Sequence, residues 1–129
     1  MSDSTNDEID RLKSLYRANY IGHDIRLIGE VDLGQRAVIG DRVIIGHPTR
    51  SEIIRSGRMD ENSIPTKIGD DVVIRSDSVI YEGVHMESRA ETGHSVVVRE
   101  GSFIGEKAII GNFTVVEFNT SIGKNSLLH

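Results

Sequence analysis

The sequence predicts an all-β protein, a parallel β-helix of about five coils with a short N-terminal helix and one protruding loop. Three observations in residues 66–129 predict it. A large residue, nearly always aliphatic, recurs at every sixth position from Ile68 to Leu128, a small or β-branched residue stands two positions before each, and glycine follows five of the eleven. A period of six fits neither a helix nor an alternating strand. It fits short strands that meet at turns and stack coil on coil, with two side chains per hexad pointing inward.

The N-terminal segment, residues 1–20, is predicted to be a tail and a capping helix. Residues 1–6 are expected to be disordered, and a helix is expected over residues 7–18. One face of this helix would carry four apolar side chains and could cover the first open coil, whose backbone and core are otherwise bare. The four side chains are those of Ile9, Leu12, Leu15 and Tyr16.

The β-helix domain is predicted over residues 21–129, with a loop insertion at about 47–65. The first hexads run from Ile21 to Ile45, and Ile45 and Ile68 are 23 residues apart, one short of four hexads. Long loops on a rigid scaffold commonly carry function, and arginines in this one could bind phosphate groups. A solvated loop of mixed charge is the alternative. Its arginines are Arg50, Arg55 and Arg58, and its apolar pair, which needs a partner surface, is Ile53 and Ile54.

The composition of the chain argues against several classes of protein. A chain of 129 residues suits a single domain, and its lack of cysteine excludes disulfides and thiolate chemistry and predicts a cytoplasmic location. No apolar run approaches the length of a membrane span. The formal net charge of -5 argues against a nucleic-acid binder. We therefore expect neither a membrane nor a nucleic acid as partner.

The hexads resemble those of the hexapeptide-repeat family, in which an aliphatic residue, glycine, two variable residues and then Ser, Thr, Ala or Val recur. Members of that family fold as left-handed parallel β-helices with eighteen residues per coil, so the resemblance implies this handedness. Residues 68–128 are most similar to sugar and nucleotide-sugar acetyltransferases. The resemblance implies transfer of acetyl from acetyl-CoA to a sugar or nucleotide-linked amino sugar, without a metal, at sites between the subunits of a homotrimer.

His94 is the candidate catalytic residue. It stands in the stretch ETGHSVVVRE, two positions after an inward residue. The stretch resembles the form I-A-H-D-C-x-V, in which nucleotide-sugar acyltransferases hold their catalytic histidine. The resemblance implies that the imidazole accepts a proton from the attacking amine or hydroxyl, which suits a group whose ordinary pKa lies near working pH. A turn histidine that bonds only locally is the alternative.

With eighteen residues per coil, residues eighteen apart lie side by side, and this predicts the neighbours of His94. Ser76 and Asn112 would lie one coil to either side, and Asp77 and Glu91 would be close enough to orient the imidazole. Backbone amides of the turns near Gly93 and Gly111 could bind an oxyanion. The candidate substrate-binding residues are His85, Arg75, Tyr81, Arg99, Asn112 and His47.

At a different corner, Tyr81, Arg99 and Glu117 are predicted to form a column with a spacing of about 4.8 Å per coil. Arg99 could then pair with Glu117 and pack on the Tyr81 ring. The column is either a substrate groove or a structural ladder. His85 is a candidate substrate contact or metal ligand, with a plain surface histidine as the alternative.

Two other functions remain open. A non-catalytic scaffold is favoured by the C-terminus, because acetyltransferases of this kind usually continue for two or more coils and this chain stops at His129 in mid-coil. A metalloenzyme like the γ-carbonic anhydrases would need three histidines that bind zinc or iron. The spacing disfavours it, since His85 and His94 are nine residues apart and that family pairs two histidines five apart.

Overall fold

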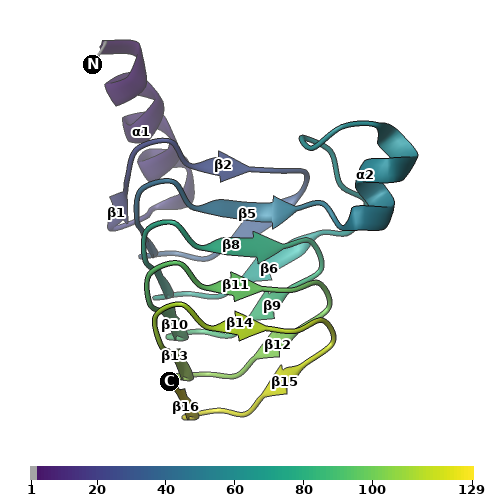
Figure 1. The fold of residues 1–129 in the computed structure, drawn as a ribbon. Coiled ribbons are helices and arrows are strands. Elements are labelled where there is room, and N and C mark those ends of the chain that lie inside the picture. Colours follow the sequence, from purple (N-terminus) through teal and green to yellow (C-terminus); the bar gives the residue numbers. More distant parts are fainter. Residues whose placement is uncertain (1–2) are drawn as a thin grey trace.

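The computed structural model describes the backbone of residues 3–129 and the side chains of residues 6–129. The chain winds into a stack of coils, with one helix at its N-terminal end and a second helix projecting beside the stack (Figure 1). Sixteen short strands form three sheets, one on each side of the stack, and every strand pair is parallel.

Each sheet takes one strand from each successive coil. Sheet I consists of β1 (Tyr20–Ile21), β4 (Val38–Ile39), β7 (Val73–Ile74), β10 (Glu91–Thr92), β13 (Ile109–Ile110) and β16 (Leu127–Leu128). Sheet II consists of β2 (Arg26–Leu27), β5 (Ile44–His47), β8 (Val79–Tyr81), β11 (Val97–Val98) and β14 (Val115–Val116). Sheet III consists of β3 (Val31–Leu33), β6 (Thr66–Ile68), β9 (His85–Met86), β12 (Phe103–Ile104) and β15 (Ser121–Ile122). The chain turns at three corners, which we call I–II, II–III and III–I after the sheets they join.

The predicted fold, a left-handed parallel β-helix of about five coils, is confirmed. Residues eighteen apart pair in register, as Thr92 does with Ile110, so each sixth residue points into one continuous core. Fourteen of the sixteen large inward positions are buried, and only Leu27 and Leu128, in the first and last coils, are partly exposed. Thr92 alone brings a hydroxyl to these positions, and that hydroxyl is buried without a hydrogen-bond partner among the described residues.

At most positions after a large inward residue, glycine is needed for a reason other than a positive φ, and Gly46, with φ 93°, is the exception. Gly93 is not among the residues with positive φ, and the left-handed residue comes two positions later, at Ser95 with φ 54°. A Cβ on Gly93 would lie 2.2 Å from Oδ1 of Asn112 in the next coil. A Cβ on Gly40 would likewise lie 2.5 Å from the backbone nitrogen of Ser76. Glycine is therefore required here because neighbouring coils approach closely.

Helix α1 (Asp3–Tyr16) lies against the first coil, as the sequence predicts for a capping helix (Figure 1). Its start differs from the prediction, because residues 3–6, expected to be disordered, are helical; residues 1–2 lie outside the described part. Ile9, Leu12 and Tyr16 pack on the core, whereas Leu15 is 63% exposed. Neither described helix has the length and apolar character that a membrane crossing needs.

The insertion leaves the stack between β5 and β6 and is more ordered than a plain loop. It contains helix α2 (Arg50–Ser56), which Thr49 caps by accepting a hydrogen bond from the Glu52 amide and which Gly57 ends at φ 71°. Strands on either side still pair in phase, but across 35 residues instead of 18, as Ile45 does with Ile80. The insertion therefore adds 35 − 18 = 17 residues, and the pairing of β5 with β8 shifts register only between Ile45 and His47, where the insertion leaves the stack.

Candidate functional site

His94 lies at the I–II corner, just after β10, with its side chain exposed. Its predicted neighbours are in place. The His94 amide donates a hydrogen bond to Oδ1 of Asn112, at 2.8 Å, and the His94 carbonyl accepts from the Phe113 amide. On the other side, the Ser95 amide donates to the Ser76 carbonyl. The turn is thus held to both neighbouring coils, while no described hydrogen bond involves the His94 ring.

A shallow hollow of about 240 Å³ lies beside this turn and gathers three of the predicted site residues. Arg75, Glu91 and Asn112 come from three successive coils, and the Gly93 and Gly111 turns complete the lining. Arg75 has no described ion pair or hydrogen bond through its guanidinium, so its charge is available to a ligand. The hollow combines a cation, a carboxylate, a side-chain amide and turn backbone. The remaining lining residues are Thr92, Ile109, Ile110 and His129.

Asp77, predicted to orient the imidazole, is held by another partner. Its two carboxylate oxygens accept hydrogen bonds from Nε and Nη2 of Arg42, at 2.7 and 3.1 Å. The hydrogen bond from Arg42 and the charge of Arg42 lower the pKa of Asp77 below its usual range, and the nearby His94 adds to the effect. Asp77 is therefore close enough to His94 for an electrostatic influence, and it stays an anion at neutral pH.

His85 lies away from this corner, on the outer face of sheet III. Its ring makes an edge contact with Phe103, with centroids 5.2 Å apart, and its Nε2 is 3.7 Å from Oε2 of Glu87. Phe103 and Glu87 also line a hollow of about 450 Å³. The structure thus gives His85 a surface position beside a separate depression.

The predicted column of Tyr81, Arg99 and Glu117 is present at the II–III corner. The Arg99 guanidinium carbon lies 5.1 Å from the Tyr81 ring centroid, and Nη1 of Arg99 is 4.0 Å from Oε2 of Glu117. The main partner of Arg99 is a residue that the sequence analysis missed, Glu100, which accepts from Nε at 2.8 Å. Burial alone would raise the pKa of Glu100, but the hydrogen bond from Arg99 outweighs it, and the pKa lies below its usual value. His47 joins the column, with its ring centroid 4.8 Å from that of Tyr81.

Glu82 and Asn62 fasten the insertion to this corner, and the sequence analysis missed both. Glu82 is 1% exposed, and its carboxylate accepts hydrogen bonds from backbone amides at both ends of the insertion: Thr49 at 2.8 Å, Ser63 at 2.9 Å and Ile64 at 3.0 Å. Asn62 donates to the carbonyls of Ile28 and Gly46, both at 2.8 Å. No hexad pattern marks these residues, because their roles arise only where the insertion returns to the stack.

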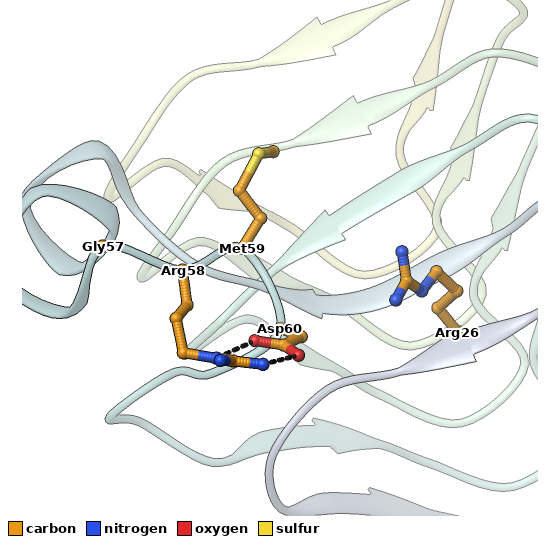
Figure 2. Close-up of a pocket in the computed structure, with 5 residues that line it drawn as sticks. All are labelled: Arg26, Gly57, Arg58, Met59 and Asp60. Atoms are coloured by element: carbon orange, nitrogen blue, oxygen red, sulfur yellow. Dashed lines mark hydrogen bonds and ion pairs between the residues drawn. The ribbon is translucent and has the colours of Figure 1, made fainter.

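The insertion's arginines are less available for phosphate than expected. Arg55 pairs with Glu52, and Arg58 donates two hydrogen bonds to Asp60, at 2.6 and 2.5 Å. Figure 2 shows Arg58 and Asp60 facing each other at a hollow of about 320 Å³, with Arg26 of β2 on another side. Arg50 and Arg26 have no described partner for their guanidinium groups. Of the apolar pair, Ile54 is 63% exposed.

No family model matches the chain. In sequence, the chain is 29% identical over 106 residues to the bifunctional protein GlmU of Baumannia cicadellinicola subsp. Homalodisca coagulata. The match covers 82% of this chain and 19% of that protein, so the chain spans about a fifth of the length of this curated relative.

In structure, the chain is similar to AntD, an N-acyltransferase from Bacillus cereus solved in complex with dTDP and 3-hydroxybutyryl-CoA. The TM-score is 0.64, and the match covers 92% of this chain and 81% of AntD at 12% sequence identity. The likeness is one of fold. In this chain the coils consist of six-residue repeats, and residues eighteen apart pair between neighbouring strands. The chain is a parallel β-helix built from six-residue repeats.

In this β-helix the predicted site residues fall at separate places. Arg75, Asn112 and Glu91 gather beside the His94 turn; Tyr81, Arg99 and His47 gather at the II–III corner; and His85 lies on sheet III. Among the side chains of residues 6–129, no group of three or more His, Asp or Glu is arranged to hold a metal ion.

Proposed function

We propose that this protein is an acyltransferase that moves an acetyl group from acetyl-CoA to an amine or hydroxyl of a sugar or nucleotide-linked sugar. The observation that carries the proposal is the hollow at Gly93, the residue before His94, where Arg75, Glu91 and Asn112 converge from three coils; His94 itself is not part of its lining. The relationship to GlmU supports it, and so does the likeness to an N-acyltransferase that binds dTDP and an acyl-CoA.

In the proposed reaction His94 is the general base. Its imidazole takes the proton as the amine or hydroxyl attacks the thioester carbonyl; the carbon–sulfur bond then breaks, and the CoA sulfur recovers the proton. Backbone amides of the turns at Gly93 and Gly111 are proposed to bind the oxyanion. Arg75 and Asn112 would bind the substrate, and Glu91 and Asp77 would orient the imidazole, Asp77 as a charge already paired with Arg42.

We propose that the active form is a homotrimer and that the cytoplasm is its location. The outer face of sheet II supports association, because its outward residues form an aliphatic column in register. The hollow beside His94 is shallow, so a neighbouring copy would supply the wall that a small-molecule site needs. The column consists of Ile44, Val79, Val97 and Val115. Light scattering of the purified protein measures the assembly directly.

The deciding experiment is calorimetric titration with acetyl-CoA and 3-hydroxybutyryl-CoA, followed by an acceptor screen. The protein and His94→Ala should bind the donor with similar affinity, while the variant loses about 10²- to 10⁴-fold in acyl transfer. His23→Ala, which removes an exposed histidine from the first I–II turn, is the control and should keep full activity. A well-folded protein that binds neither donor would contradict the proposal and favour a non-catalytic scaffold.

A further inference from the structure

The His47 ring has a hydrogen bond that selects between its two neutral tautomers. Its Nδ1 lies 2.8 Å from the carbonyl oxygen of Pro48. A carbonyl oxygen only accepts hydrogen bonds, so Nδ1 carries a proton in this contact, and in the neutral ring Nε2 is then the nitrogen with the lone pair. No described hydrogen bond or ion pair within residues 3–129 uses Nε2. His47 therefore offers a preset acceptor, unlike His94, whose ring has no described hydrogen bond to select a tautomer.

Glu82 holds the segment that fixes this tautomer. The Glu82 amide donates to the His47 carbonyl at 2.9 Å, and the Glu82 carboxylate accepts from the Thr49 amide at 2.8 Å. The residue between these two anchors is Pro48, whose carbonyl binds the imidazole. Because Glu82 is buried and also binds the returning end of the insertion, the Pro48 carbonyl is set by the base of the insertion as a whole.

The charges around His47 disfavour an anionic ligand. The nearest cation in the column, Arg99, is already bound to Glu100 and lies over Tyr81. Glu82, Glu100 and Glu117 bring three carboxylates to this corner, where Arg99 is the cation of the column and Arg50 begins helix α2 three residues after His47. An acceptor nitrogen beside an aromatic ring and an excess of carboxylates suits a neutral or cationic group that donates hydrogen bonds.

We propose that the II–III corner at the base of the insertion is a binding subsite for a hydroxyl- or amine-bearing sugar ring, in which His47 Nε2 accepts a hydrogen bond from the sugar beside Tyr81. Glu82 is the positioning residue, since it acts through Pro48 rather than on the ligand. The subsite is separate from the hollow at the His94 turn; it rests on the proposed function only for the class of its ligand, a sugar, and its charges disfavour phosphate at this corner. It does not require His94 to be the base, so the two proposals can fail separately.

The first test is nitrogen-15 NMR of the histidine rings in the labelled protein. His47 should show the neutral form protonated at Nδ1. In Glu82→Gln, only one side-chain oxygen is left to accept the hydrogen bonds that two carboxylate oxygens accept now. His47 should therefore lose its preference for one tautomer. Circular dichroism should show that the stack remains folded. Glu117→Gln changes an exposed carboxylate of the same corner and should leave the tautomer unchanged. A parent His47 protonated at Nε2 would overturn the proposal.

The second test follows the same ring signals during titration with D-glucosamine, N-acetylglucosamine and inorganic phosphate. Both sugars should shift the His47 signals and phosphate should not. His47→Phe keeps an aromatic ring against Tyr81 but removes both nitrogens, and it should weaken glucosamine binding at least tenfold. His23→Phe, at an exposed histidine of the I–II corner, should leave this binding unchanged. Shifts caused by phosphate alone, or full binding by His47→Phe, would refute the subsite whether or not acyl transfer is detected.

Discussion

Thr92 is the residue at which the core departs from its own pattern. Its hydroxyl is buried with no described partner, although its neighbours in the same column, Ile74 and Ile110, are aliphatic. By contrast, the buried hydroxyl of Ser78 donates to the Gly93 carbonyl and accepts from the Val96 amide. The hexad pattern requires a buried side chain of this size at position 92 but gives no use for its oxygen.

We predict that Thr92→Val stabilises the protein. Valine has the same shape and removes an unsatisfied buried hydroxyl, whose desolvation costs about 1–3 kcal/mol. The free energy of unfolding from urea titration should rise by about 1–2 kcal/mol. Ser78→Ala is the matched comparison and should lower it, because two backbone groups lose their partner. A loss of stability in Thr92→Val would mean that the hydroxyl has a partner after all.

At the scale of elements, two ion pairs join the turns on either side of β4 to the turns on either side of β7, across the insertion. Arg36 binds Asp71 with two hydrogen bonds, at 2.8 and 2.9 Å, and Arg42 binds Asp77 in the same way. Each pair spans 35 residues and lies outside the core. In both, the hydrogen bond from arginine and its charge lower the pKa of the aspartate.

These shifts predict a dependence of stability on pH. A carboxyl whose pKa is lower in the folded state stabilises the fold above the unfolded-state pKa of about 3.9. That contribution disappears as the pH falls through the lowered value. Arg42→Gln should therefore be less stable than the parent at pH 7, and the difference should shrink as the pH falls below about 4. Urea unfolding at pH 7, 5 and 3 measures it, and Arg75→Gln, which removes an arginine without a described partner, should show no such trend.

The repeated elements could be predicted from the sequence, whereas the unrepeated ones could not. Repetition in the hexads predicted the coils, their register and the neighbours of His94, because each repeat has the same surroundings as the next. Helix α2 and the Glu82 anchor could not be predicted, since they depend on where a single, unrepeated segment returns to the stack. The sequence left two interpretations of the insertion's arginines, phosphate binding and a solvated loop of mixed charge, and Arg55 and Arg58 face carboxylates of their own segment. Sequence spacing could not distinguish these pairs from free cations.

For the whole molecule, stability should vary along the stack. Each coil contacts only its neighbours, so a residue with coils on both sides loses more packing when it is truncated. Ile80→Ala, in a fully buried central position, should cost about 2–5 kcal/mol. Ile122→Ala, 9% exposed in the last sheet III strand, should cost less than half as much. Chemical denaturation of the two variants tests this, and equal losses would contradict a stack held by nearest-neighbour contacts.

The change from 18 to 35 residues across the insertion also bears on the order in which the chain assembles. Strand pairs within the segment from β6 onward, and within the first two coils, close loops of 18 residues, whereas β3–β6, β4–β7 and β5–β8 close longer ones. Doubling a loop costs only about 0.6 kcal/mol of closure entropy, which corresponds to about a threefold slower contact. We therefore expect two nuclei, one on each side of the insertion, whose docking through Glu82 and Asn62 is the late step of folding.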